Sequence, residues 1–274
     1  MPLLLWIILC AAVGGIASAA VAVAFLWVPE RQSARLLPHF LSFATGALLG
    51  AAFLALLPEA IEAAGAQSAR GLGVALVSGL GLFFVIEKAV LWWHSGREEP
   101  DGPAGINEHH EHGHHVNELH GHRRHRASGI LVLFGDSLHN ALDGVLICAA
   151  FLNSVSLGLV STFAVVAHEV PHRVGDFAIL VHAGWSPRRA LLLNLATGLA
   201  SVAGAIIAYF ALREAMGVLP YALAVAAAGF LYIAVAGLIP GLHGRSDPRT
   251  SVMQVVLISA GILVIAWVER LAGR

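Results

Sequence analysis

Eight apolar runs, each long enough to cross a lipid bilayer, make up most of this 274-residue chain. Short segments with proline, glycine or charge separate them, and the runs cover residues 3–28, 36–63, 71–94, 129–152, 156–183, 188–212, 218–241 and 250–270. A transmembrane helix needs roughly 20 mostly apolar residues, whereas a barrel strand needs about ten residues of alternating polarity. The runs therefore predict an all-α integral membrane protein with eight transmembrane helices.

The composition agrees with this fold class. Hydrophobic residues make up 58% of the chain and charged residues 12%, whereas soluble domains carry about 25% charged residues. This excludes an ordinary cytosolic enzyme, a disordered chain and a nucleic-acid-binding protein. We therefore expect the lipid bilayer as a partner and no nucleic acid. The first run, Leu3 to Val28, exceeds the apolar part of a signal peptide, about 7–15 residues, so we expect it to remain as the first span.

Positive charge is distributed unevenly between the two sets of loops, and cytoplasmic loops are normally the richer in Lys and Arg. The loops after the first, third, fifth and seventh helices, with their helix ends, hold Arg31, Arg35, Lys88, Arg97, Arg123, Arg124, Arg126, Arg188, Arg189, Arg245 and Arg249. The opposite side holds only Arg70, Arg213, Arg270 and Arg274. This bias predicts a protein of the cell membrane (inner or plasma) with both termini outside.

The predicted helices divide the chain into four regions. Transmembrane helices 1–3 occupy residues 1–94, a cytoplasmic His-rich loop occupies 95–127, helices 4 and 5 occupy 128–183, and helices 6–8 occupy 184–274. The loop contains eight histidines: His109, His110, His112, His114, His115, His120, His122 and His125. Such tracts bind divalent metals through neutral imidazole. We expect weak, flexible metal binding there, and a solvated linker is the alternative.

Most ionisable residues inside the spans are in the fourth and fifth helices. Because such groups are costly in lipid, each is a functional candidate. In the fourth helix, GDSLHNALDG places its polar residues at offsets 0, 3, 4 and 7, on one helix face: Asp136, His139, Asn140 and Asp143. In the fifth, HEVPHRVGD places His168, His172 and Asp176 four residues apart, with Glu169 one step round the helix.

This spacing favours a metal site. Two side chains at positions i and i+4 can hold one ion, and imidazole, carboxylate and amide groups suit zinc, with iron and manganese tolerated. Both groups lie near the middle of their helices, at the depth where transporters hold their substrates. A buried polar network that joins helices is the alternative. A shorter repeat, Leu56-Leu57-Pro58 and Leu238-Ile239-Pro240, suits a transporter with two related halves.

The two polar motifs resemble a known family. GDSLHNALDG followed by HEVPHRVGDFAIL is similar to the ZIP family of divalent-metal transporters, in the branch with an HExPHExGD signature. The predicted spans, the outside termini and the His-rich loop between the third and fourth helices fit that family as well. The resemblance implies a 3+2+3 inverted-repeat bundle, with helices four and five as the binding unit between two three-helix halves.

The resemblance also implies a function and a set of metal ligands. It implies transfer of Zn²⁺ into the cytoplasm without ATP, with no enzymatic activity and no resident cofactor; Fe²⁺, Mn²⁺ and Cd²⁺ are other candidate ions. It further implies that a homodimer can form. The ligand positions carried over from the family are His139, Asn140, Asp143, His168, Glu169 and His172.

The chain departs from the family pattern at four positions. Arg173 replaces the second Glu of the signature, Ala55 replaces a common His, and Gly237 and Gly241 replace a common Asp and Glu. Arg173 follows Glu169 by four residues, an order that favours a helical ion pair. One hypothesis is that Arg173 engages Glu169 and discourages a second metal. One ion would then be held mainly by His139, Asp143, His168 and His172. The alternative is that Arg173 points away to the membrane interface.

Two other functions remain open at this stage. HEVPH matches the HExxH motif of zinc proteases, and an intramembrane metalloprotease is one alternative. Pro171 between the two histidines and the unused His-Asn-x-x-Asp set of the fourth helix argue against it. A membrane protein that senses metal without transporting it is the second alternative. Metal uptake into liposomes would separate a sensor from a transporter.

Overall fold

The computed structural model describes residues 2–26, 30–65, 68–95, 114–182, 184–243 and 247–271, and this part of the chain contains no strand. The elements are α1 (Pro2–Leu26), α2 (Glu30–Gly50), η1 (Ala51–Leu56), α3 (Leu57–Ala64), α4 (Ala69–Ser95), α5 (His114–Asn153), α6 (Val155–His182), α7 (Pro187–Thr197), α8 (Leu199–Arg213), η3 (Met216–Val218), α9 (Leu219–Tyr232), η4 (Ile233–Leu238), α10 (Ile239–Leu242) and α11 (Pro248–Leu271). The all-helical prediction is therefore confirmed.

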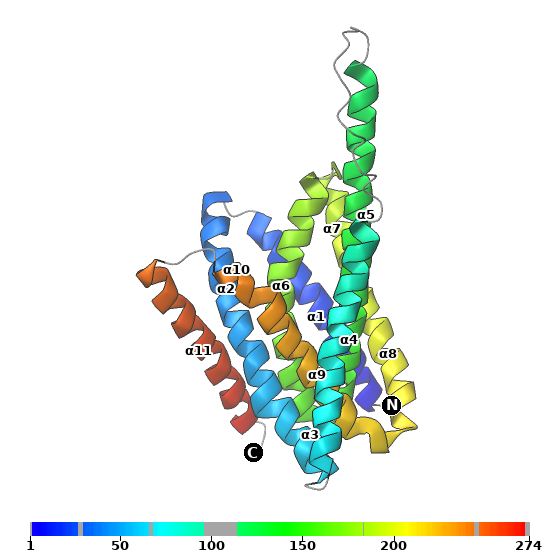
Figure 1. The fold of residues 1–274 in the computed structure, drawn as a ribbon, viewed down its shortest axis with the longest axis vertical. Coiled ribbons are helices and arrows are strands. Elements are labelled where there is room, and N and C mark those ends of the chain that lie inside the picture. Colours follow the sequence, from blue (N-terminus) through cyan, green and yellow to red (C-terminus); the bar gives the residue numbers. More distant parts are fainter. Residues whose placement is uncertain are drawn as a thin grey trace.

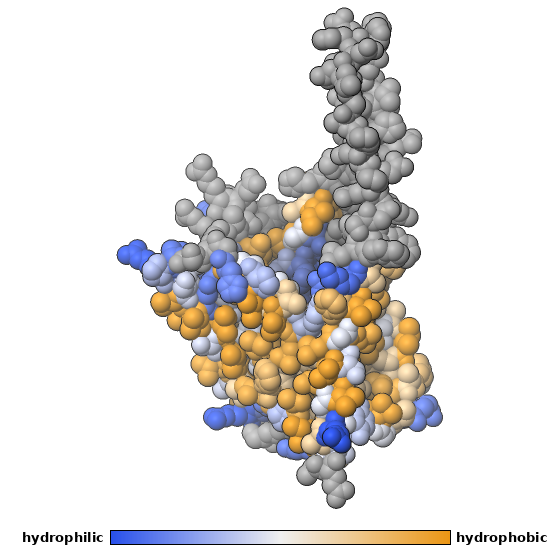
Figure 2. Space-filling view, viewed as in Figure 1, coloured by the Kyte–Doolittle hydropathy of each residue, from blue (hydrophilic) through white to orange (hydrophobic). Residues whose placement is uncertain are grey.

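Within the described residues, six helical segments are long and apolar enough to cross a membrane: Leu3–Val21, Leu36–Ala64, Ala69–Ala89, Pro187–Arg213, Met216–Leu242 and Pro248–Leu271. Large apolar side chains on the outer helices are exposed, among them Val77 on α4, Ile207 on α8 and Leu263 on α11. In Figure 2 such residues form an apolar band between two polar rims. The protein is an integral membrane protein.

Two of the long helical segments contain a π-helical stretch at corresponding places. In one, η1 joins α2 to α3, and in the other, η4 joins α9 to α10. The stretches end at Leu56 and Leu238, the first residues of the repeated Leu-Leu-Pro and Leu-Ile-Pro motifs. Proline has no backbone N–H to donate to the turn before it. A π-helical turn, with its i→i+5 hydrogen bonds, changes which backbone groups pair next to the proline. The two motifs thus produce the same local structure.

The helices α5 and α6 lie in the interior of the bundle and are separated only by Ser154, so they run antiparallel (Figure 1). On one side α5 packs very closely against α8. A Cβ atom added at Gly144 would lie 1.9 Å from the carbonyl oxygen of Ser201, and one added at Gly204 would lie 2.0 Å from that of Ala141. Only glycine permits this close approach, which holds the turn of α5 from His139 to Asp143 against α8.

Part of the predicted His-rich loop has helical backbone in the structure. Residues 114–127 form the beginning of α5, which extends well beyond the other helices in Figure 1. His114, His115, His120, His122 and His125 therefore lie on helical backbone, whereas His109, His110 and His112 fall outside the described residues. A helix continues past the apolar run because backbone hydrogen bonding does not require apolar side chains. Metal binding by this segment stays a prediction.

The two ends of the chain lie at the same end of the bundle. In Figure 1, α1 begins and α11 ends at the end opposite the extension of α5. The side of the membrane on which each end lies stays a prediction.

Candidate metal centre

Four of the six predicted ligands converge at the contact between α5 and α6. His139 and Asp143 lie one turn apart on α5, and His168 and Glu169 are neighbours on α6. The four side chains place ligand atoms within 4.8 Å of one another. Since antiparallel helices bring these turns side by side, the i, i+4 spacing on α5 and the His-Glu pair on α6 form a single group.

The distances within this group are those of side chains directed at a common point. The Nε2 atoms of His139 and His168 are 3.2 Å apart. An Oδ2 of Asp143 lies 3.3 Å from Nε2 of His168 and 3.7 Å from Nε2 of His139. On the other ring nitrogen of His168, Nδ1 lies 3.1 Å from the carbonyl oxygen of Ala164. An Nδ1–H donated to this carbonyl leaves Nε2 free of a proton, as a metal ligand requires.

Several buried polar atoms of the group and of the adjacent His172 have no hydrogen-bond partner. These are both carboxylate oxygens of Asp143, Oε1 of Glu169 and Nε2 of His172. The side chains of Asp143, His168 and Glu169 are at most 2% exposed, whereas that of His139 is 25% exposed. Buried polar atoms are normally paired, and an unpaired set often marks an ion site. The chemistry of these donors fits a divalent cation such as zinc.

The two remaining predicted ligands lie next to the group in different ways. The ring of His172 is 5.4 Å from that of His139 and 6.1 Å from that of His168, measured between centroids. The Nδ2 of Asn140 donates to the backbone oxygen and to Oδ1 of Asp136, both at 2.8 Å. Its Oδ1 accepts a hydrogen bond of 2.7 Å from Arg173. The amide oxygen of Asn140 is therefore already engaged, and ligation by Asn140 and His172 stays a prediction.

Arg173 is completely buried and faces this network. Its Nε donates to Oε2 of Glu169 at 2.9 Å, which confirms the expected pairing and shows that Arg173 does not point to the membrane interface. Its NH1 donates to Oδ1 of Asn194 at 2.8 Å, to the Asn194 carbonyl and to Thr197 Oγ1 at 2.6 Å. The same NH1 lies 3.5 Å from Oδ2 of Asp136.

Asn194 and Thr197 are residues that the sequence reasoning missed. Both are buried on α7, and the Nδ2 of Asn194 also donates to the backbone oxygen of Arg173 at 3.0 Å. The available signal was two polar residues, three positions apart, in the apolar run LLLNLATG. Such a pair lies on one helix face and indicates a polar partner on a neighbouring helix.

A cavity of about 310 Å³ leads to one side of the group. Its polar lining consists of Glu87, Asp136, His139, His172, Asp176 and Tyr232. Asp136 precedes His139 on α5, and Asp176 follows His172 on α6. Because the two helices are antiparallel, this polar cavity lies toward the end of the bundle from which α5 extends. Gly237, at one of the positions that departs from the family pattern, also lines it.

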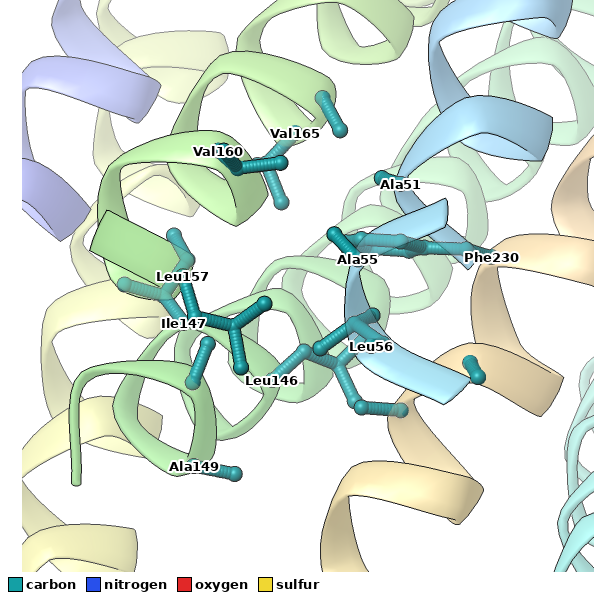
Figure 3. Packing of buried hydrophobic residues seen from close by; sticks show 14 of the residues in the cluster. Ala51, Ala55, Leu56, Leu146, Ile147, Ala149, Leu157, Val160, Val165 and Phe230 are labelled. Carbon is teal, nitrogen blue, oxygen red and sulfur yellow. The ribbon is translucent and has the colours of Figure 1, made fainter. Parts of the chain in front are cut away.

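The opposite side of the group is closed by apolar side chains. Figure 3 shows this apolar cluster, which includes Ala51, Ala55, Leu56, Leu146, Ile147, Ala149, Leu157, Val160, Val165 and Phe230. The ring of Phe230 lies 6.4 Å from that of His168, between centroids. Residues 146–149 follow Asp143 on α5 and residues 157–165 precede His168 on α6, so the cluster lies toward the α5–α6 connection. Ala55, where the family pattern has a common His, is completely buried in it.

Comparison with known proteins identifies the family. The model described as "ZIP Zinc transporter" matches residues 3–269 of the chain. The chain belongs to the ZIP family. It is 34% identical over 245 residues to "Zinc transporter ZIP13" of Pongo abelii, covering 84% of this chain and 66% of that protein. The human ZIP13 is also 34% identical, over 263 residues, with 84% and 70% covered.

A more distant ZIP relative extends the comparison. Human "Zinc transporter ZIP4" is 33% identical over 267 residues, covering 78% of this chain and 40% of that protein. The chain thus spans about two thirds of the length of the ZIP13 relatives and less of ZIP4. ZIP proteins are transporters and not enzymes, so an HExxH metalloprotease is not favoured for this chain.

Proposed function

We propose that this ZIP protein carries Zn²⁺ across a cell membrane through the centre between α5 and α6. The supporting observation is the convergence of His139, Asp143, His168 and Glu169 around buried donor atoms that lack partners. A dehydrated divalent cation satisfies these atoms at once. His172 completes the set from the adjacent turn, with Asn140 at its edge. Fe²⁺, Mn²⁺ and Cd²⁺ share these ligand preferences and are candidate alternative ions.

The proposed architecture has eight spans in a 3+2+3 arrangement. α5 and α6 are not among the six apolar spans found in the described residues, because they carry the ionisable side chains of the centre. A pair of polar helices enclosed by apolar ones satisfies the rule that intramembrane charges face the bundle interior. The matching π-helical stretches η1 and η4 support two related halves.

The proposed direction of transport is into the cytoplasm. The positive-inside bias assigns the cytoplasm to the side of the α5 extension, on which the polar cavity lies, and places both termini outside. In this state the ion exchanges with water through the cavity, while the apolar cluster blocks the other side. Transport then requires a second state in which the cluster parts and the cavity closes. A homodimer is compatible with this scheme, because the exposed apolar helices leave ample surface for pairing within lipid.

Zinc uptake by the purified protein in liposomes tests the proposal. We expect uptake by the wild type, and loss of uptake in His168→Ala and His172→Ala. The matched control is His243→Ala, since His243 is exposed and lies beyond the centre at the end of α10. Equal uptake by His168→Ala and the control would contradict the proposed site. Zinc binding without uptake would instead identify a metal sensor.

A further inference from the structure

We infer that Arg173 is a tethered cation that fills a second cation position beside the metal centre, so that each chain holds one metal ion. The inference rests on the proposed function and adds the number of ions that the centre holds. It starts from the position of the guanidinium group, which is in contact with polar groups from α5, α6 and α7 at distances that range up to 3.5 Å.

The surroundings of the guanidinium consist of oxygen atoms. They are Oδ2 of Asp136, Oδ1 of Asn140, Oε2 of Glu169, Oδ1 of Asn194 and Oγ1 of Thr197. Carboxylate, amide and hydroxyl oxygens are the ligands of hard divalent cations. All five side chains are buried. Without the guanidinium, this would be a buried oxygen cage next to the first ion, with nothing to satisfy it.

Arg173 also divides the donor atoms between the two positions. It binds Oε2 of Glu169, so that only Oε1, which lies 3.8 Å from Nε2 of His139, remains for the metal. It likewise engages Oδ1 of Asn140. Glu169 therefore cannot bridge two metal ions, and Asn140 cannot supply its oxygen to either. The first position retains the imidazoles, Asp143 and one oxygen of Glu169.

Charge balance within the network leads to the same ion count. With neutral histidines, the carboxylates of Asp136, Asp143 and Glu169 together with the guanidinium leave two negative charges. One divalent ion neutralises them, whereas a second would leave an excess of two positive charges in a region shielded from water, which is costly. The oxygens that surround the guanidinium do not include those of Asp176, which lines the polar cavity, where water is available.

Metal stoichiometry tests this inference. The probe is Zn²⁺ at saturation on the purified full chain, measured by equilibrium dialysis with elemental analysis. The ion count of the centre is the excess over the double variant Asp143→Ala/His168→Ala, which retains the His-rich segment and so subtracts its contribution. We expect one ion for the wild type, and a doubling to two for Arg173→Glu, which adds a carboxylate where the cation was.

Two further variants keep the test decisive if Arg173→Glu does not fold. Arg173→Lys retains the charge and should hold one ion, whereas Arg173→Gln removes it and should admit a second. The control is Arg213→Glu on α8, because Arg213 is exposed and contacts Tyr209 instead of the centre. Two ions in the wild type or in Arg173→Lys, or one ion in both Arg173→Glu and Arg173→Gln, would overturn the inference. A wild type without any ion at the centre would remove the proposed function itself.

Discussion

The two sides of the candidate metal centre differ in polarity. Toward the α5 extension, the cavity has carboxylates, imidazoles and a tyrosine in its lining, next to apolar residues such as Phe83 and Leu142. Toward the α5–α6 connection, the apolar cluster contains only hydrocarbon side chains among its labelled residues (Figure 3). The same two helices carry both environments, within about two turns of each other. Under the proposed function, this difference corresponds to one of two access states, the one open toward the side of the His-rich segment.

The largest expected effect comes from removing a carboxylate from the centre. Asp143→Ala should abolish zinc uptake and lower zinc affinity by more than about 100-fold, since loss of even a group behind the ligands costs 10–100-fold. Isothermal titration and liposome uptake measure the two effects.

The control for this variant is Asp247→Asn. Asp247 lies before α11, outside the membrane spans, and the hydrogen bond from Thr250 lowers the pKa of its carboxyl below the usual value. Asp247 is therefore an ionised carboxylate that lies far from the centre, whereas Asp143 must be ionised at the centre to bind a metal. Wild-type affinity in Asp143→Ala would show that the polar side does not bind the ion.

The next effect concerns the apolar side. Phe230→Ala should lower the free energy of unfolding by about 3–5 kcal/mol, because it leaves a cavity in a closely packed region. Thermal unfolding in detergent measures the loss. Phe210→Ala serves as the control, since Phe210 is 59% exposed toward the lipid side whereas Phe230 is completely buried. Similar shifts in both variants would mean that the apolar cluster is not a packed barrier.

Thiol labelling compares the two sides directly. Cys148 adjoins the apolar cluster and is completely buried, and Cys10 is buried as well. Gly237→Cys places a thiol on the polar cavity. We expect a water-soluble maleimide to label this cysteine at least about tenfold faster than Cys148, since thiol reactivity requires access and ionisation. Equal rates would remove the asymmetry, whereas a reversal after zinc addition would reveal the second access state.

The smallest effect is expected at the mouth of the cavity. The hydroxyl of Tyr232 donates to Oε2 of Glu87, and both residues line the cavity. Glu87→Gln removes a negative charge that concentrates cations near the opening, so uptake should fall a few-fold, with a weaker dependence on ionic strength. Tyr232→Phe retains the charge and should leave the salt dependence unchanged. The slope of the uptake rate against salt concentration distinguishes the two variants.

Much of the centre could be predicted from the sequence because it depends on local spacing. His139 and Asp143, at i and i+4, must share a helix face, and one short connection brings their turn beside that of His168 and Glu169. The engagement of Asn140 by Arg173 could not be predicted. It depends on Asn194 and Thr197, which are distant in sequence and come from α7. Helical periodicity says nothing about which neighbouring helix a buried arginine will meet.

The amino-acid sequence by itself determined the membrane fold and the position of the candidate metal centre along α5 and α6. Hydropathy and helical spacing are local properties, and lipid permits few backbone structures, so these features follow directly. Only the tertiary structure decided which donor atoms remain free for a metal and which side of the centre water can reach. Those properties depend on contacts among α5, α6, α7 and α9, where burial makes each polar atom seek the nearest available partner.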